Sequence, residues 1–168
     1  MRIRPETPDD VAAIQSLLLA AFPTPIEREI VDQLRVADCE QLSLVAEEEG
    51  EIIGQVLFTP ATIESEEETV AGWGLAPVSV LPKSQRRGVG AQLIKTGLAQ
   101  LRESGASFVI VLGDPAYYPK YGFQPASKWN VRSEFVGVPD EAFMAIFYRE
   151  APLAGGVAKY RPEFNAAV

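Results

Sequence analysis

The chain has 168 residues, 47% of them apolar and 23% charged, and this composition is typical of one folded domain of ordinary size. It contains no histidine and one cysteine, which excludes a Ser-His-Asp or Cys-His catalytic site, a Cys/His zinc site and an intrachain disulfide. Any acid–base chemistry must therefore use carboxylates, tyrosines, lysines, the thiol, backbone groups or water.

The charges are divided unevenly along the chain, and they add up to −8. Residues 1–76 hold 4 basic and 16 acidic residues, whereas residues 77–168 hold 11 basic and 7 acidic ones. This balance argues against a nucleic-acid partner and allows a local cationic site in the second half. No apolar stretch is long enough for a signal peptide or a membrane span, so we expect a cytoplasmic protein without a membrane partner.

Apolar spacing in the first half predicts a short strand, two helices and an antiparallel meander. Residues 2–4 alternate polar and apolar side chains, and residues 7–10 (Thr-Pro-Asp-Asp) then resemble a capping box that starts a helix. A second helical pattern covers residues 26–34. Strands separated by charged turns are expected at residues 42–46, 52–59, 61–63 and 70–80.

The second half predicts a helix at residues 90–104 and a strand at Phe108–Leu112, whose unbroken apolar run is typical of a strand buried on both faces. Further strands are expected near residue 123 and at residues 142–149 and 156–160. We therefore expect a single domain over residues 1–168 of the α/β class, with a mixed sheet and one strand–helix–strand crossover.

Residues 78–91 carry the features that point to chemistry. A strand ends there, and a loop with Gly88 and Gly90 opens a helix beside Arg86 and Arg87. Such a loop can turn successive backbone N–H groups toward an anion at the positive end of the helix dipole. It lacks the Gly-Lys-Ser/Thr of a Walker A loop and the third glycine of a dinucleotide fingerprint. The segment predicts a phosphate or pyrophosphate cradle, and the alternative is a glycine-containing turn with exposed arginines.

Three motifs resemble, in their order, the GNAT N-acetyltransferase superfamily and its YhbS-like bacterial branch. Gln85–Gly90 (QRRGVG) is similar to the family signature Gln/Arg-x-x-Gly-x-Gly/Ala. Gly113–Phe123 is similar to the block GDPxYYxxFGF of that branch, except that Tyr121 replaces a phenylalanine. The opening Arg4–Asp10 resembles the family as well. The resemblance covers residues 1–150 and implies a mostly antiparallel central sheet flanked by helices, with a splayed strand before the pyrophosphate loop.

The resemblance also implies acetyl-CoA, or another acyl-CoA, as the donor, and no metal. The pyrophosphate would bind the backbone N–H groups from Arg86 to Ala91, and the pantetheine arm would pair with the strand at Val78–Val80. The amide near Ser79 or Val80 could hold the thioester oxygen as it becomes an oxyanion. The cofactor-binding residues expected on this basis are Val78, Ser79, Val80, Gln85, Arg86, Arg87, Gly88, Val89, Gly90, Ala91, Tyr117, Tyr118 and Tyr121.

A tyrosine is the acid that the resemblance implies for the leaving thiolate. The family pattern Tyr-x-x-x-Gly-Phe matches at Tyr118, and Tyr117 and Tyr121 are close alternatives. Each could instead be a packed core aromatic with its hydroxyl at the surface. Asp114 is expected to cap the short helix that holds Tyr118.

The general base is left open, because no Asp or Glu lies between Trp73 and Lys83, where some family members carry a glutamate. A water held by Ser79 could serve. Glu27 or Glu29, at the start of the second helix, could act from the acceptor side, and Glu29 is the candidate taken forward. The alternative for Glu29 is a solvated charge that is favourable at a helix start.

These features predict an enzyme that moves an acetyl group from acetyl-CoA to a primary amine by direct transfer in a ternary complex. The acidic first half favours a cationic acceptor, a small molecule or a peptide, and Phe22–Pro25 and Lys128–Pro139 are expected to line its pocket. The alternative is a CoA-binding module with little or no catalytic activity, which the missing strand carboxylate favours and Tyr118 opposes. Exposed strand edges near the C-terminus would permit a homodimer.

Overall fold

The computed structural model describes residues 1–167, and the chain forms two compact units in it. The first unit is built from three segments and the second from two: residues 1–58, 76–99 and 162–167, then Thr59–Leu75 and Gln100–Arg161. Strands β3 (Glu51–Glu64) and β4 (Thr69–Val80) and helix α3 (Val89–Glu103) run from one unit into the other. The single domain expected over residues 1–168 stays a prediction.

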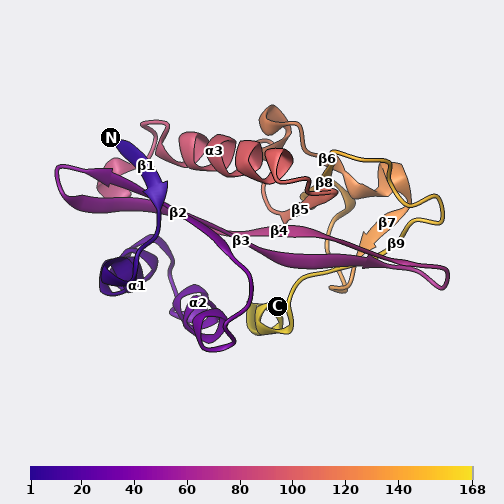
Figure 1. The fold of residues 1–168 in the computed structure, drawn as a ribbon, viewed down its shortest axis with the longest axis horizontal. Coiled ribbons are helices and arrows are strands. Elements are labelled where there is room, and N and C mark those ends of the chain that lie inside the picture. Colours follow the sequence, from indigo (N-terminus) through magenta and orange to yellow (C-terminus); the bar gives the residue numbers. More distant parts are fainter. Residues whose placement is uncertain (168) are drawn as a thin grey trace. The chain divides into compact units, whose positions relative to one another are not determined.

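The first unit is a sheet with helices on both faces (Figure 1). Its strands follow the order β1 (Arg2–Pro5), β2 (Leu42–Glu48), β3 and β4, and β1 and β3 are both antiparallel to β2. Helices α1 (Val11–Ala21) and α2 (Ile26–Val36) lie on one face, and α3 lies on the other. The strand and the two helices expected at the start of the chain are confirmed.

The capping box expected at residues 7–10 is present, but it starts a short 3₁₀ helix, η1 (Pro8–Asp10), that leads into α1. The backbone N–H of Thr7 donates to Oδ2 of Asp10 at 2.8 Å. The guanidinium of Arg4 donates to both oxygens of the same carboxylate at 2.7 and 2.9 Å, and this holds the pKa of Asp10 well below its usual range. The start of α1 is thereby fastened to β1, which carries Arg4.

The second unit continues β3 and β4 into a mixed sheet. Strand β4 is parallel to β5 (Phe108–Leu112), β5 is antiparallel to β8 (Phe143–Phe147), and β8 is antiparallel to β6 (Gln124–Pro125). Strand β9 (Gly156–Lys159) pairs with β3 in antiparallel fashion and with β7 (Val131–Ser133) in parallel fashion. The predicted α/β class with a mixed, mostly antiparallel sheet is confirmed.

Short 3₁₀ helices lie in several of the connections and after the last strand. Besides η1 they are η2 (Pro82–Ser84), η3 (Tyr118–Tyr121), η4 (Ala126–Trp129), η5 (Asp140–Ala142) and η6 (Pro162–Ala167). Among residues 1–167, no helix has the length and apolar character needed to cross a bilayer.

The meander differs from its prediction at one proline. The strands expected at residues 52–59 and 61–63 form the single strand β3, which passes through Pro60. Along the edge of β3 that pairs with β2 and β9, pairing with β2 ends at Phe58 and pairing with β9 begins at Thr62. Pro60 therefore lies between the two paired segments. The N–H that proline lacks is therefore not needed by either ladder. Strand β7 was not predicted, because its pairing with the distant β9 defines it and no local pattern does.

Candidate functional site

Strand β4 leads into the loop before α3 and ends at Val80. The N–H of Leu81 donates to the carbonyl of Ile53 at 2.9 Å, which keeps this end of β4 on β3. The side chain of Ser79 is buried, and its hydroxyl has no hydrogen-bond partner among residues 1–167. A buried hydroxyl of this kind can bind a water, which is the role that the sequence left open for Ser79.

The loop between β4 and α3 has the backbone geometry of an anion site. Arg86 and Gly88 both have φ in the left-handed region, at 62° and 82°, with Arg87 between them. Such an alternation turns successive N–H groups to one side, and the first N–H groups of α3 have no partner inside the helix. An added Cβ at Gly88 would meet nothing within 4 Å, so the φ angle and not the space favours glycine there.

The side chain of Gln85 belongs to the loop's own framework. Its Nε2 donates to the carbonyl of Val80 at 3.1 Å, so it ties the loop back to the end of β4. The expected contact of Gln85 with the cofactor stays a prediction.

The two arginines of the loop differ in their surroundings. Nη2 of Arg87 donates to both carboxylate oxygens of Glu48 at 3.0 and 3.1 Å, so its charge already has a partner. Arg86 is exposed and forms no ion pair within the part of the chain that the structure describes. Arg86 is therefore the loop cation whose charge is available to an anionic ligand.

Three tyrosines gather around η3 in the second unit. The rings of Tyr117 and Tyr118 meet edge to face at 5.1 Å, those of Tyr117 and Tyr121 at 5.4 Å, and Nζ of Lys120 lies 3.9 Å from the centroid of Tyr117. The carboxylate of Asp114 accepts the N–H of Ala116 at 2.8 Å. Asp114 therefore orders the turn before η3; the N-cap of η3 itself is Tyr117, which corrects the role expected for Asp114.

Tyr118 is held in a place where its phenol stays protonated. The ring lies against Gly113 and meets Phe123 edge to face at 5.7 Å. Burial, with smaller contributions from Tyr117 and Asp114, raises the pKa of Tyr118 to about 12. Burial also raises the pKa of Tyr121. At neutral pH Tyr118 is therefore a hydrogen-bond donor.

Tyr160 occupies the point where the pairing of β4 with β5 ends. The last paired residues are Leu75 and Val111. The hydroxyl of Tyr160 donates toward the carbonyls of Leu75 at 3.1 Å and Ile110 at 3.3 Å, and a backbone hydrogen bond from Leu112 reaches it as well. Burial nevertheless raises the pKa of Tyr160 well above its usual range. One side chain thus joins the two strands where their own ladder stops.

The sequence did not single out Tyr160, which it placed only at the end of a closing strand. Its partners lie 85 and 50 residues away along the chain, so no local spacing could have indicated the contact. The sequence offers an indirect sign of this contact in the glycine at position 74. A Cβ there would lie 2.5 Å from the Tyr160 ring, so a larger residue does not fit beside it.

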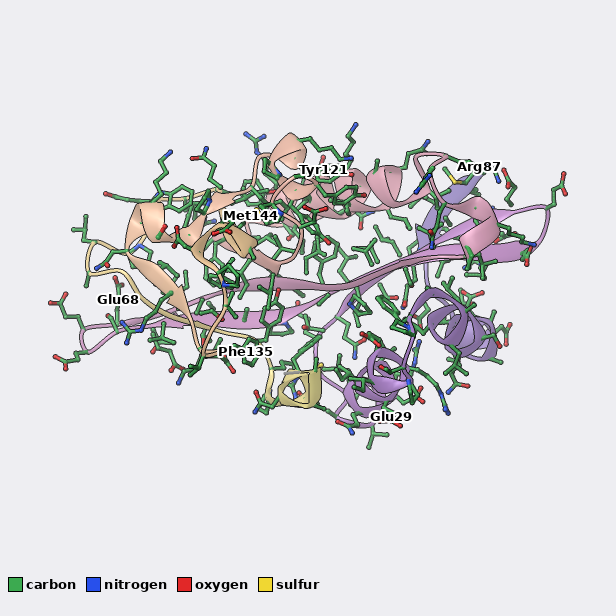
Figure 2. The ribbon with its side chains drawn as sticks, turned by 180° about the vertical axis from the view of Figure 1, so that it is seen from behind. Glu29, Glu68, Arg87, Tyr121, Phe135 and Met144 are labelled. Carbon is green, nitrogen blue, oxygen red and sulfur yellow. The ribbon has the colours of Figure 1, made fainter. Side chains whose placement is uncertain are left out.

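The carboxylates at the start of α2 are in different environments. Glu29 is exposed on α2 (Figure 2), whereas Oε2 of Glu27 is buried without a hydrogen-bond partner among the described residues. The segment Lys128–Pro139, expected to contribute to an acceptor pocket, does line a pocket in the second unit. Across residues 1–167, no group of three or more acidic or sulfur side chains could hold a metal.

Comparison with known proteins gives a consistent result along the whole chain. Residues 2–126 match the model of the family described as the acetyltransferase (GNAT) domain. The uncharacterized N-acetyltransferase YhbS of Escherichia coli (strain K12) is 36% identical over 169 residues, which cover 98% of this chain and 99% of that protein. The uncharacterized N-acetyltransferase YjhQ of the same strain is 38% identical over 120 residues, 70% of this chain and 66% of that protein.

Two solved structures are similar over nearly their full length. The crystal structure of the Escherichia coli GNAT family N-acetyltransferase YhbS in complex with CoA has a TM-score of 0.89 at 34% identity, covering 98% of this chain and 91% of that one. The crystal structure of a Brucella melitensis GNAT family acetyltransferase in complex with acetyl-CoA has a TM-score of 0.79 at 37% identity, covering 97% of each chain.

Proposed function

Since this chain belongs to the GNAT acetyltransferase family and is an N-acetyltransferase, we propose that it transfers the acetyl group of acetyl-CoA directly to a primary amine within a ternary complex. The observation that carries the proposal is the loop before α3, where the left-handed residues Arg86 and Gly88 prepare a row of N–H groups for a pyrophosphate. Two relatives of similar fold, solved with CoA and with acetyl-CoA, support the same donor.

The donor binds along β4 and the loop that follows it. The backbone N–H groups from Arg86 to Ala91 hold the pyrophosphate, and the free charge of Arg86 adds to the attraction. The pantetheine arm runs along Val78–Val80 and pairs with that backbone in the manner of an added strand.

The reaction forms one bond and breaks another. The amine nitrogen attacks the thioester carbonyl carbon, and the resulting oxyanion is held by the backbone amide near Ser79 or Val80. The C–N bond is then complete, the C–S bond breaks, and CoA leaves as a thiolate that takes up a proton. The amine loses a proton to a base, so charge and atoms balance over the cycle.

Tyr118 supplies the hydrogen bond and the proton that the leaving thiolate needs. With a pKa of about 12 it is protonated at any working pH, but it is a weaker acid than an ordinary thiol, which has a pKa of about 8.5. Tyr118 therefore acts first by donating a hydrogen bond to the sulfur as charge develops there. The negative charge of the bound donor cannot lower the pKa of a phenol, so complete transfer of its proton requires the site to make the desolvated thiolate more basic than an ordinary thiol.

Three groups in the first unit are candidates for the base that takes the proton of the amine. Glu29 is exposed, Glu27 has one enclosed oxygen, and the buried hydroxyl of Ser79 can hold a water. Glu29 is the proposed base. Separate Glu29→Gln and Glu27→Gln variants decide the point, because the base variant lowers kcat at neutral pH while the other leaves it within about 2-fold.

A CoA-binding module with little or no catalysis is the second candidate, favoured by the absence of any Asp or Glu between Trp73 and Lys83. An assay of free thiol released from acetyl-CoA, run across a panel of amines, separates the two functions. The enzyme releases CoA in proportion to amine concentration. A protein that binds acetyl-CoA but releases no CoA with any amine is the module.

A further inference from the structure

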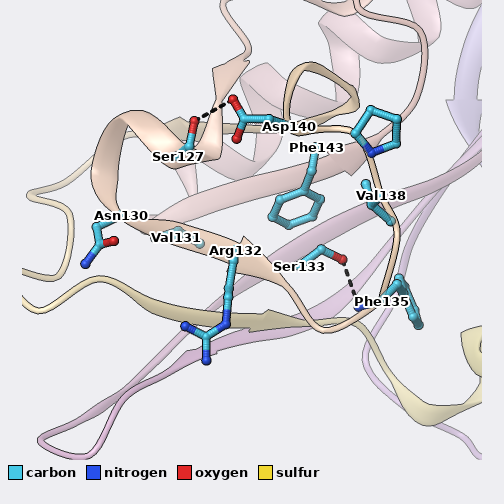
Figure 3. A pocket seen from close by; sticks show the side chains of 10 residues that line it. Ser127, Asn130, Val131, Arg132, Ser133, Phe135, Val138, Asp140 and Phe143 are labelled. Atoms are coloured by element: carbon cyan, nitrogen blue, oxygen red, sulfur yellow. Dashed lines mark hydrogen bonds between the residues drawn. The ribbon is translucent and has the colours of Figure 1, made fainter.

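A pocket of about 330 Å³ lies entirely within the second unit (Figure 3). It is formed by η4, β7, the loop that follows β7, η5 and the first residue of β8. Its volume is at the lower end of the range for small-molecule sites. A pocket of this size suits a small ligand or a single side chain.

One side of the pocket is apolar. Val131 and Phe143 are buried, and Phe135 and Val138 close the pocket from the loop. The ring of Phe135 also stacks against Tyr160 at 6.5 Å between centroids. The pocket therefore shares a wall with the residue that joins β4 and β5.

The strand that carries Phe143 also helps to place Tyr118. Phe143 pairs with Leu112, and the carbonyl of Ala142 accepts the N–H of Gly113 at 2.9 Å. Gly113 is the residue against which the Tyr118 ring lies. The pocket and the proposed acid are thus positioned by the same pair of strands.

The charge directed into the pocket is negative. Oδ2 of Asp140 accepts a hydrogen bond from the hydroxyl of Ser127 at 2.9 Å (Figure 3), and its other oxygen accepts none from the residues that the structure describes. The guanidinium of Arg132 points away from Phe143, as the alternation of side chains along β7 requires, and it also lines a second hollow beside Glu66. Asp140 is therefore the charge that a ligand in this pocket meets.

We propose that this pocket binds the acceptor, and that the acceptor is a small primary amine with an apolar body and a second cationic group. The apolar body lies against Phe143 and Val138, and the second cation binds Asp140. The first amine, as the neutral base, takes the acetyl group. This assignment rests on the proposed transferase function and adds the substrate class to it.

The test compares two amines that differ in one charge. Cadaverine carries two amino groups on a five-carbon chain, and pentylamine carries one. Binding to the protein with CoA present is measured by calorimetry, and acetyl transfer is measured separately by release of free thiol. We expect cadaverine to bind about 3- to 5-fold more tightly than pentylamine, because an ion pair open to solvent has about that effect.

Two pairs of variants locate the binding. Asp140→Asn keeps the shape and should abolish the preference for cadaverine, whereas Glu141→Gln, on an exposed neighbour outside the pocket, should keep it. Val138→Trp fills the pocket and should weaken both amines at least about 10-fold with CoA affinity unchanged. Val136→Trp, on a fully exposed side chain of the same loop, is the steric control.

Each outcome decides one of the two proposals. If Asp140→Asn keeps the preference, or if Val138→Trp binds both amines as the wild type does, the pocket assignment is overturned even when acetyl transfer is normal. If cadaverine binds through Asp140 but no amine releases CoA, the transferase proposal fails and the cation site stands. A lysine peptide that is acetylated better than cadaverine, with no dependence on Asp140, also overturns the acceptor class.

Discussion

The loop before α3 and the end of the β4–β5 pairing are built in opposite ways. The loop is made of consecutive residues, and its shape follows from the φ angles of Arg86 and Gly88. The strand junction is made by Tyr160, whose hydroxyl partners Leu75 and Ile110 are far away along the chain. Changes in the loop should therefore act on donor binding with little effect on folding, whereas changes at the junction should act on both.

The largest effect is expected from Tyr118, which lies on η3, shortly after β5, one of the two strands of the junction. Tyr118→Phe removes the hydrogen-bond donor for the thiolate and should lower kcat by about 100-fold, with the KM for acetyl-CoA changed by less than about 2-fold. Steady-state kinetics measure both constants. Tyr117→Phe, in the neighbouring ring, is the matched control. An unaltered kcat for Tyr118→Phe would remove this residue from the mechanism.

Tyr160→Phe tests the junction itself. The ring remains, but the carbonyls of Leu75 and Ile110 lose their donor, which should lower the free energy of unfolding by about 1–3 kcal/mol. Urea denaturation measures this change. Tyr148→Phe, on a half-buried ring that contacts Arg102, should cost less than about 0.5 kcal/mol. Equal losses of unfolding free energy in the two variants would mean that the hydrogen bonds of the Tyr160 hydroxyl do not stabilise the fold.

Gly88→Ala tests the loop through its backbone angle. A Cβ disfavours the φ of 82° by about 1–2 kcal/mol, so the affinity for CoA should fall about 10-fold. Gly50→Ala, in the β2–β3 turn, has a φ of 80° and equally open surroundings. That variant should keep its CoA affinity. If both variants bind CoA equally well, the conformation of Gly88 does not serve the ligand.

Arg86 and Arg87 should contribute unequally to CoA affinity, with a smaller effect than that of Gly88→Ala. Arg86→Ala should weaken CoA about 3- to 5-fold at low salt, with the difference shrinking as salt rises. Arg87→Ala should change CoA affinity by less than about 2-fold, because Arg87 is already paired with Glu48. Titration of CoA at two salt concentrations makes the comparison, and a larger loss for Arg87 would reverse the assignment.

The smallest effect concerns pH. Tyr118 donates only while it is protonated, which holds below its pKa, and burial has moved that pKa up to about 12. No loss of kcat due to Tyr118 should therefore occur on raising the pH from neutral until that value is approached. A fall in kcat at mildly alkaline pH that disappears in Tyr118→Phe would contradict this and show that the pKa of this tyrosine in the working enzyme lies far below about 12.

Much of the site was predictable because its chemistry is local. The signature from Gln85 to Gly90 indicated the anion loop, and the block from Gly113 to Phe123 indicated the tyrosines. In both places neighbouring residues set the backbone. The same reasoning misplaced Asp114, because a carboxylate can bind an N–H on either side of a turn boundary and only the folded turn selects which.

The sequence pattern sufficed for the α/β class, most strands along the chain and the glycine-containing loop before α3, since periodicity and glycine placement act over a few residues. Only the tertiary structure decided which arginine is free, which tyrosine joins β4 to β5, and that Asp140 and Phe143 line one pocket. Each of these depends on contacts between segments tens of residues apart, such as Arg87 with Glu48 and Tyr160 with Leu75. A side chain can offer a ligand only the charge or hydrogen-bonding capacity that such contacts have not already used.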